Sequence, residues 1–402
     1  MHKVIASVVL FVYIISFYIV SIGVESLPVW KQNDAIIPTS IADETVDMKL
    51  ESGGAILIEA NTGKILYEHN SHEKLRPASV TKVMTILLIM ENLKEGKFTL
   101  EDKVPCGSNA RKMGGSQIWL AENEELTVNE MLKAICVVSA NDCSVAMAEY
   151  IAGSEEAFVA LMNKRAKELG MNDTTFVNCH GIDEDGHVTS PYDIALMSRE
   201  LTIKHPKITE YTTIWMDTLR DGKSELVNTN KLIRNYKGAT GLKTGSTAIA
   251  LYNLSATATR DDLSLIAVIM KAPTTDIRFG EAKKLLDYGF NSYQYKQLTT
   301  EGEIVSAIKI NKGIKDEVEV VFEKTEGTLL KKGQDKNISQ EIKLDETLNA
   351  PINKGQKVGE VSFMMSNQEI SKVDIVASEN IKKISIMNML AYVYNSWFRI
   401  LR

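Results

Sequence analysis

The sequence predicts an α+β fold: an antiparallel sheet covered by helices, then a small all-β domain and a C-terminal amphipathic helix. Three observations lead to this prediction. Apolar runs of strand length lie at both ends of residues 51–293, with helical periodicity between them. Residues 294–379 consist of short alternating segments. Residues 380–402 place apolar side chains every three to four positions.

Two hairpins are predicted in the first domain. Residues 55–58 and 64–67 flank a turn that contains Gly63, and residues 251–258 and 263–270 flank a polar turn. Strands at both ends of a domain, with helices between them, favour one antiparallel sheet that joins the ends.

The helices of this domain are placed by apolar periodicity and by their end signals. One is expected to begin at Ser79, after Pro77, because Val83 and Leu87 follow at helical spacing. The others are expected at 127–137, 142–152, 155–169, 191–203 and 277–288.

The all-β domain is predicted from alternating segments separated by Lys, Gly, Asp and Asn. It carries no cluster of catalytic type. The expected strands are 303–310, 318–322, 340–344, 357–364 and 370–376.

Composition limits the class of protein. With 402 residues, 44% of them hydrophobic, the chain can bury the cores of two domains. A formal charge of −6 and the lack of a basic stripe argue against a nucleic-acid partner.

The N-terminal residues indicate export. Lys3 precedes an apolar run from Val4 to Val24, so residues 1–26 are predicted to be a signal peptide and 27–50 a linker. The run is also long enough for an uncleaved membrane anchor. Either way, the rest of the chain is expected to be exported, to the outer face of the cytoplasmic membrane or the cell wall compartment.

The C-terminal segment 380–402 has an apolar face with aromatic residues and a polar face with cations. This pattern favours a helix lying in the membrane interface. The alternative is a helix that packs on the β domain.

Cysteines and histidines give no metal pattern. The four cysteines (106, 136, 143 and 179) are predicted to be buried small apolar residues rather than disulfides. Cys179 and His180, close to Asp183, are predicted to belong to a Gly-rich polar loop rather than to a metal site. No metal or cofactor is expected.

Three short motifs in fixed order carry the chemistry: Ser79-Val80-Thr81-Lys82, Ser139-Ala140-Asn141 and Lys243-Thr244-Gly245. Each is weak alone. Together they supply a nucleophile, a base, a proton relay and a carboxylate binder, which indicates acyl transfer.

The first motif joins nucleophile and base. On a helix, Lys82 lies one turn beyond Ser79, and the positive end of the helix dipole favours charge on the attacking oxygen. Burial and a second cation, Lys243, would lower the pKa of Lys82 so that it can act as a base.

The other two motifs serve the substrate. Gly245 allows close approach of an extended peptide, and the N–H groups of Ser79 and Ser246 are candidates for an oxyanion hole. Ser139 is expected to bridge the two lysines and to pass a proton to the leaving amine. Asn141 is expected to hold a substrate amide or to orient Lys82.

These residues resemble the penicillin-recognising serine enzymes, and their neighbourhoods resemble the D-alanyl-D-alanine carboxypeptidases, the low-molecular-mass penicillin-binding proteins. The resemblance covers about residues 50–380 and implies a β-lactamase/transpeptidase-like first domain. It rests on Arg76–Thr85, Val138–Asp142, His180–His187 and Gly241–Gly245.

The resemblance implies roles for single residues. Ser79 would be the acyl-enzyme nucleophile, Lys82 the base and Ser139 the third catalytic residue, while Lys243 and Thr244 would bind the terminal carboxylate of the substrate. Arg278 would help to hold that carboxylate, although an arginine in such a helix is more often a solvated charge. Two departures are Ala140, where the family commonly has glycine, and the less polar segment 247–250.

The function implied is a serine D-Ala-D-Ala carboxypeptidase that acts on peptidoglycan stem peptides and is acylated by β-lactams. One alternative is a class A-like β-lactamase, which needs a glutamate to activate water; Glu168, near Asn172, is a superficial candidate. The other alternative is a catalytically weak penicillin-binding scaffold.

Overall fold

The computed structural model describes residues 48–334 and 337–385. The expected signal peptide, nearly all of the linker and most of the C-terminal helix lie outside the described residues, so they stay predictions. Within these two ranges, no helix combines the length and apolar character needed to cross a bilayer.

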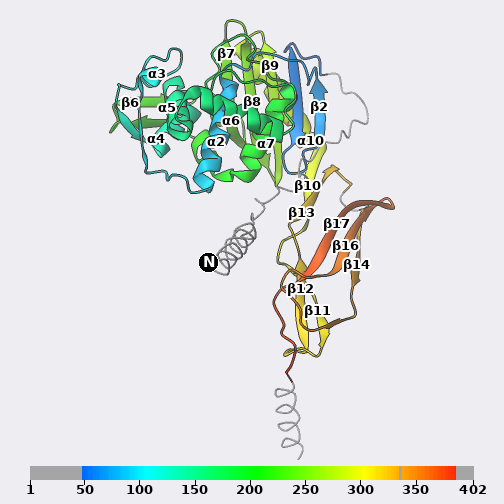
Figure 1. The fold of residues 1–402 in the computed structure, drawn as a ribbon. Helices are drawn as coiled ribbons and strands as arrows, with labels where there is room; N and C mark the ends of the chain where they lie inside the picture. The colour runs from blue at the N-terminus through cyan, green and yellow to red at the C-terminus, as the bar shows by residue number, and fades with distance from the viewer. Residues whose placement is uncertain (1–47, 335–336, 386–402) are drawn as a thin grey trace, which may run out of the picture. The chain divides into compact units, whose positions relative to one another are not determined.

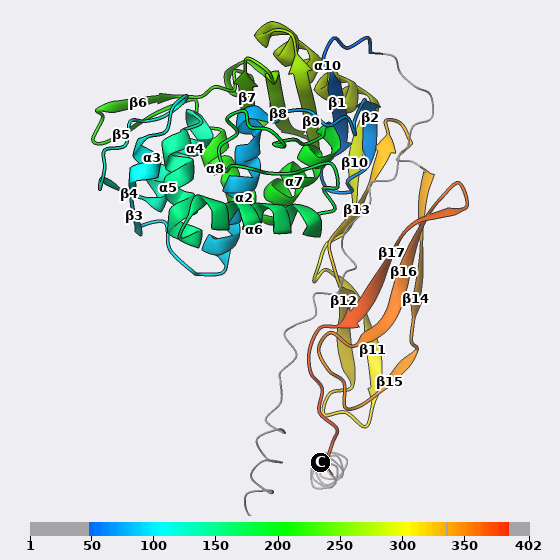
Figure 2. The same cartoon turned by 45° about the horizontal axis from the view of Figure 1, so that its top comes forward.

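A five-stranded antiparallel sheet forms the centre of the first domain (Figures 1 and 2). The two predicted hairpins meet in it, because the first strand of one pairs with the last strand of the other. The order is β2-β1-β9-β8-β7, so β7 is an edge strand. The strands are β1 (Gly54–Glu59), β2 (Ile65–His69), β7 (Ala239–Thr247), β8 (Leu251–Arg260) and β9 (Leu263–Ala272).

Helices cover both faces of this sheet (Figure 1). They are α2 (Lys82–Lys94), α4 (Val128–Val137), α5 (Asn141–Ala152), α6 (Glu155–Glu168), α7 (Pro191–Lys204) and α10 (Thr275–Ser292). Strand β9 shows why both faces need cover. Its Ile266 and Val268 pack into the core with α2 to α7, whereas Leu265 and Ala267 pack into the core with α10. A strand that is buried on both faces reads as a continuous apolar run.

The helix expected to begin at Ser79 begins three residues later than predicted. Residues Ala78–Thr81 form a 3₁₀ turn, η1, and α2 begins only at Lys82. Side chains at positions i and i+3 of a 3₁₀ turn lie on the same side, so Ser79 and Lys82 still meet. The other expected helices are confirmed, and α10 extends further at both ends.

Short elements complete the domain and were not predicted. They are β3 (Lys103–Pro105) with β4 (Glu125–Thr127), β5 (Met216–Leu219) with β6 (Ser224–Val227), and the helical turns α3 (Ser108–Arg111), η2 (Pro206–Ile208), α8 (Thr209–Thr212) and α9 (Leu232–Asn235).

The predicted all-β domain is confirmed. Its six-stranded sheet has the order β14-β16-β17-β12-β11-β15 and is held by a core that includes Val320, Val361 and Ile375. Three strands were not predicted: β15 of this sheet, and β10 (Tyr293–Thr299) and β13 (Glu326–Lys331), which pair separately. The six strands are β11 (Ile304–Asn311), β12 (Glu317–Phe322), β14 (Ile338–Leu344), β15 (Thr347–Asn349), β16 (Lys357–Met365) and β17 (Gln368–Ala377).

All four cysteines are free and buried, as the sequence predicted. Burial raises the pKa of the Cys106 thiol to about 11 and that of Cys136 to about 12. Thiols in this state are poor nucleophiles, because the thiolate is the reactive form.

Candidate active site

The nucleophile candidate lies where η1 meets the edge strand β7. Ser79 is half-buried, and its neighbours Ala78 and Val80 are buried beneath it. A Cβ atom added to Gly245 would lie 2.8 Å from the backbone nitrogens of Ser79 and Val80. Only glycine permits this contact, so the third motif packs directly against the first.

Lys82 lies beside the nucleophile. Its side chain is fully buried, and Nζ lies 3.1 Å from Ser79 Oγ, 2.6 Å from Asn141 Oδ1 and 2.6 Å from the His180 carbonyl oxygen. Burial, and next the charge of Lys243, lower the pKa of Lys82 well below its ordinary value. A neutral amine has two N–H groups and one lone pair. In that form, with the two N–H groups donated to Asn141 and His180, the lone pair would be left to accept from the Ser79 hydroxyl.

Asn141 is fixed by its place at the start of α5. Its Nδ2 donates to the Gly114 carbonyl at 2.7 Å, which leaves Oδ1 to face Lys82. The next residue, Asp142, accepts hydrogen bonds from the backbone N–H groups of Ile118 and Leu120. The second motif therefore anchors both the base and the loop that follows Gly114.

Ser139 lies in the turn between α4 and α5, with a left-handed φ of 65° and 3% exposure. Its Oγ has no hydrogen-bond partner among the described residues. The expected bridge from Ser139 to the two lysines is therefore not formed in this structure. A buried, unpaired hydroxyl is unfavourable, and it is available to a group that enters the site.

Lys243 is 1% exposed, and its Nζ donates to the Thr244 carbonyl at 3.0 Å. Burial, with a smaller contribution from the charge of Arg278, lowers the pKa of Lys243 to about 7. The Thr244 hydroxyl lies 2.7 Å from the Thr229 hydroxyl, and Ser246 is exposed on β7.

Arg278 is not a solvated helix charge. It is 6% exposed, and its Nη1 donates to the carbonyl oxygens of Asn253 (3.3 Å) and Gly245 (3.5 Å). The guanidinium also lies 4.5 Å from the centre of the Phe279 ring. Burial lowers its pKa to about 10. The structure thus brings the arginine to the backbone of the Lys-Thr-Gly segment.

The loop at residues 178–189 contributes to the site in a way that the sequence did not reveal. It is irregular, as predicted, and its His180 carbonyl holds Lys82. Arg76 donates to the Glu184 carbonyl and pairs with Asp185, while Thr85 donates to the Cys179 carbonyl. Within residues 48–334 and 337–385, no His, Cys, Asp and Glu side chains converge as a metal-ligand set.

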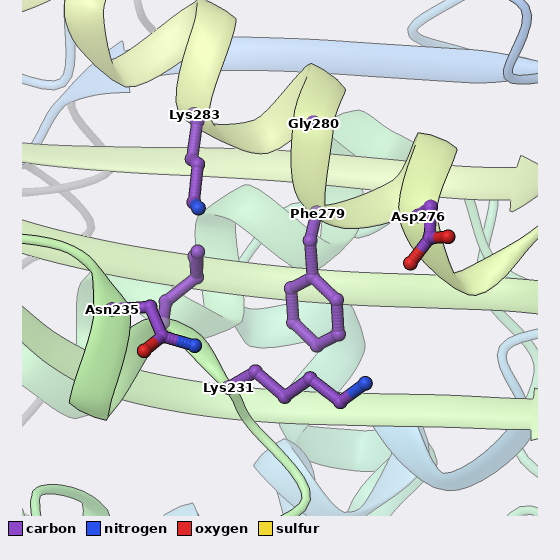
Figure 3. Close-up of a pocket in the computed structure, with 7 residues that line it drawn as sticks. Lys231, Asn235, Asp276, Phe279, Gly280 and Lys283 are labelled. Carbon is purple, nitrogen blue, oxygen red and sulfur yellow. The ribbon is translucent and has the colours of Figure 1, made fainter.

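A hollow of about 240 Å³ lies between α9 and the start of α10 and contains none of the predicted site residues (Figure 3). It shares one wall with the site, because Phe279 lines it and also contacts the Arg278 guanidinium. Its lining residues are Lys231, Leu232, Asn235, Asp276, Phe279, Gly280 and Lys283.

The position of Glu168 argues against the role that a β-lactamase would need, in which a glutamate activates the deacylating water. This residue ends α6, and its carboxylate lies 3.4 Å from the Arg165 guanidinium, in an ion pair on the helix surface. Gly170 follows with a left-handed φ of 76°, which is typical of a helix end.

Comparison with known proteins agrees with this site. Residues 40–274 match the family described as D-alanyl-D-alanine carboxypeptidase, and residues 293–383 match the family described as penicillin-binding protein 5, C-terminal domain. The chain is 43% identical to D-alanyl-D-alanine carboxypeptidase DacF of Bacillus subtilis, over 88% of this chain and 92% of that protein. It is 33% identical to DacC of Escherichia coli, over 90% and 93%.

Solved structures show the same likeness. Penicillin-binding protein 5 of Haemophilus influenzae is 29% identical, with a TM-score of 0.70, over 85% of this chain and all of that one. Penicillin-binding protein D2 of Listeria monocytogenes, in its ampicillin-bound form, is 30% identical, with a TM-score of 0.56, over 61% of this chain and all of that one.

These matches confirm the α+β catalytic domain and the all-β domain of the predicted fold, whereas the C-terminal helix stays a prediction. They support the interpretation as a serine-type D-Ala-D-Ala carboxypeptidase and do not favour the β-lactamase alternative. With its three motifs gathered around Lys82, the chain belongs to the D-alanyl-D-alanine carboxypeptidase family.

Proposed function

We propose that Ser79 attacks the carbonyl carbon of the D-Ala-D-Ala bond while Lys82 takes the hydroxyl proton. The observation that carries this proposal is the position of the Lys82 amine. Nζ lies 2.6 Å from both Asn141 Oδ1 and the His180 carbonyl oxygen and 3.1 Å from Ser79 Oγ, so a neutral amine can donate to the first two and accept from the third. The N–H groups of Ser79 and Ser246 would then stabilise the oxyanion.

The tetrahedral intermediate collapses by breaking the C–N bond. The leaving amine of the terminal D-alanine needs a proton, which Ser139 would deliver from Lys82. Water then attacks the Ser79 ester while Lys82 accepts a proton of the water. As the bond between the carbonyl carbon and Ser79 Oγ breaks, Lys82 returns this proton to Oγ, and the shortened peptide leaves with a new terminal carboxyl group. The cycle uses the chain's own side chains and water.

The substrate's terminal carboxylate would lie near Lys243, Thr244 and Arg278. Both cations are buried, and both have lowered pKa values, so an anion that pairs with them would relieve an unfavourable charge. An extended substrate would pair beside Gly245 with the edge of β7 that has no strand partner among the described residues.

The cellular setting that we propose is the outer face of the cytoplasmic membrane. The support is the apolar run at Val4–Val24 and the amphipathic pattern of residues 380–402. In this setting the protein would act on peptidoglycan stem peptides that end in D-Ala-D-Ala, and β-lactams would acylate Ser79.

The test combines intact mass after incubation with penicillin and release of D-alanine from a D-Ala-D-Ala peptide. We expect a long-lived adduct and D-alanine release for the wild type, and neither for Ser79→Ala or Lys82→Ala. Rapid loss of the drug without an adduct would instead indicate a β-lactamase. An adduct without D-alanine release would indicate a penicillin-binding scaffold.

A further inference from the structure

The residue before the nucleophile has an unusual backbone conformation. Ala78 has a φ of 48°, in the left-handed region, and is 1% exposed. This conformation is unfavourable for any residue with a Cβ atom, so the surroundings must hold it in place. The structure shows two contacts that do so.

The first contact is a chain of hydrogen bonds that ends on the Ala78 carbonyl. The Val177 N–H donates to His187 Nδ1 at 2.9 Å, so the proton of the neutral ring is on Nε2. His187 Nε2 lies 2.7 Å from Thr81 Oγ1 and donates to it. The Thr81 hydroxyl in turn donates to the Ala78 carbonyl at 2.8 Å. All three donors therefore point the same way.

His187 suits this role because it stays neutral. The ring is 1% exposed, and burial lowers its pKa to about 4. A doubly protonated ring could not accept from the Val177 N–H. In its neutral form, the ring has one acceptor and one donor, and both are used.

The second contact is steric. Gly181 has a left-handed φ of 92°, and a Cβ atom added to it would lie 1.9 Å from the Ala78 oxygen. The backbone of the 178–189 loop therefore lies directly against this carbonyl. The Ala78 oxygen is therefore confined by the Gly181 backbone on one side and accepts a hydrogen bond from the Thr81 hydroxyl.

Fixing this carbonyl also fixes the next N–H. The C=O of Ala78 and the N–H of Ser79 belong to one planar trans peptide unit and point in opposite directions. Accepting the proposed function, in which the Ser79 N–H belongs to the oxyanion hole, we propose that His187 and Thr81 are positioning residues that aim this N–H through the Ala78 carbonyl. They act without touching the substrate.

Two variants at Thr81 separate this role from packing. Thr81→Val keeps the shape and removes the hydroxyl, whereas Thr81→Ser keeps the hydroxyl. Thr85→Val is the matched control. Thr85 lies one turn further along, on α2, and is fully buried like Thr81, and its hydroxyl donates to the Cys179 carbonyl of the same loop at 2.6 Å. His187→Gln offers a second route, because its amide can still donate to Thr81.

Two quantities are measured. The first is the rate constant of acylation by a fluorescent penicillin, determined separately from the non-covalent binding constant. The second is the affinity for a peptide boronic acid that mimics the tetrahedral adduct. Thr81→Val should slow acylation by about tenfold to a hundredfold, less than the roughly 10²–10³-fold expected when an oxyanion donor is lost outright. Boronate affinity should fall in parallel, with non-covalent binding unchanged. Thr81→Ser should restore both the acylation rate constant and the boronate affinity. His187→Gln should lose only a small part of each. Thr85→Val should keep both near their wild-type values.

Equal slowing in Thr81→Val and Thr85→Val would overturn the inference, because loop docking alone would then explain the effect. Wild-type rates in Thr81→Val would overturn it as well. Failure of the proposed function looks different: the wild type itself would form no acyl-enzyme.

Discussion

Lys82 Nζ lies closer to Asn141 Oδ1, at 2.6 Å, than to Ser79 Oγ, at 3.1 Å. The His180 carbonyl oxygen lies equally close, at 2.6 Å, so the base is held by the second motif and the 178–189 loop more tightly than by the nucleophile that it serves. This arrangement lets Ser79 move to its substrate while the amine stays in place, and it makes the charge state of Lys82 sensitive to position 141.

Asn141→Asp should shift the pH dependence of acylation. A carboxylate at this position favours the protonated form of Lys82 and raises its pKa, so the neutral base is reached only at higher pH. The rate of penicillin acylation at pH 7 should fall at least tenfold, and its acidic limb should move to higher pH. Asn141→Ala, which adds no charge, should slow acylation without that upward shift. An unchanged limb in Asn141→Asp would show that Lys82 is not the titrating base.

Lys243→Met should stabilise the fold at neutral pH. The pKa of Lys243 is about 7 in the folded protein, against an ordinary value of 10.5. Between these values the unfolded chain holds a proton that the folded chain lacks, so wild-type stability rises with pH across this window. At 1.36 kcal/mol per pKa unit, the gain from removing the lysine at pH 7 is at most about 5 kcal/mol.

Urea unfolding at pH 7 and at pH 10 measures this effect. The advantage of Lys243→Met in free energy of unfolding should be largest at pH 7 and should shrink toward pH 10.5. An advantage that does not depend on pH would mean that burial does not perturb this lysine.

Lys243→Ala should weaken recognition of a free terminal carboxylate. A charge-assisted hydrogen bond contributes about 1.5–3 kcal/mol, or roughly tenfold to a hundredfold in rate. The comparison is between a D-Ala-D-Ala peptide and its C-terminal amide. The wild type should prefer the acid, and the variant should lose most of that preference. If the preference survives in Lys243→Ala and collapses in Arg278→Ala, the arginine is the main anchor.

Truncation before Lys382 should release the protein from membranes and leave hydrolysis of a soluble peptide intact. The removed residues carry the apolar face and the cations of the predicted interfacial helix and none of the three motifs. Flotation with vesicles that contain anionic lipid measures binding. Truncated protein that remains bound would move the anchor to the N-terminal apolar run.

The motifs and most elements could be predicted because their signals are local. Helical periodicity located α4 to α7, and apolar runs located β8 and β9. The 3₁₀ turn at Ala78–Thr81 could not be predicted, because alanine gives no local sign of a left-handed φ. Distant partners such as Thr81 and Gly181 impose that conformation.

Parts of the site were hidden for a related reason. The His180 carbonyl accepts a hydrogen bond from Lys82. Every residue type has a backbone carbonyl, so the residue type at position 180 does not indicate this contact. The burial of Arg278 depends on packing against Phe279 and on carbonyls of β7 and β8, which come together only in the folded sheet. Spacing along the chain cannot show such contacts.

Strand β7 has a sheet neighbour on one side only among the described residues. A ligand that completes the sheet there would be recognised through its main chain, whose hydrogen-bonding groups are the same in every amino acid except proline. Selectivity would then come from the chain end, where Lys243 and Arg278 lie, and residues further from that end could vary at little cost in affinity. One such enzyme could process cell walls whose cross-linking residues differ in chemistry.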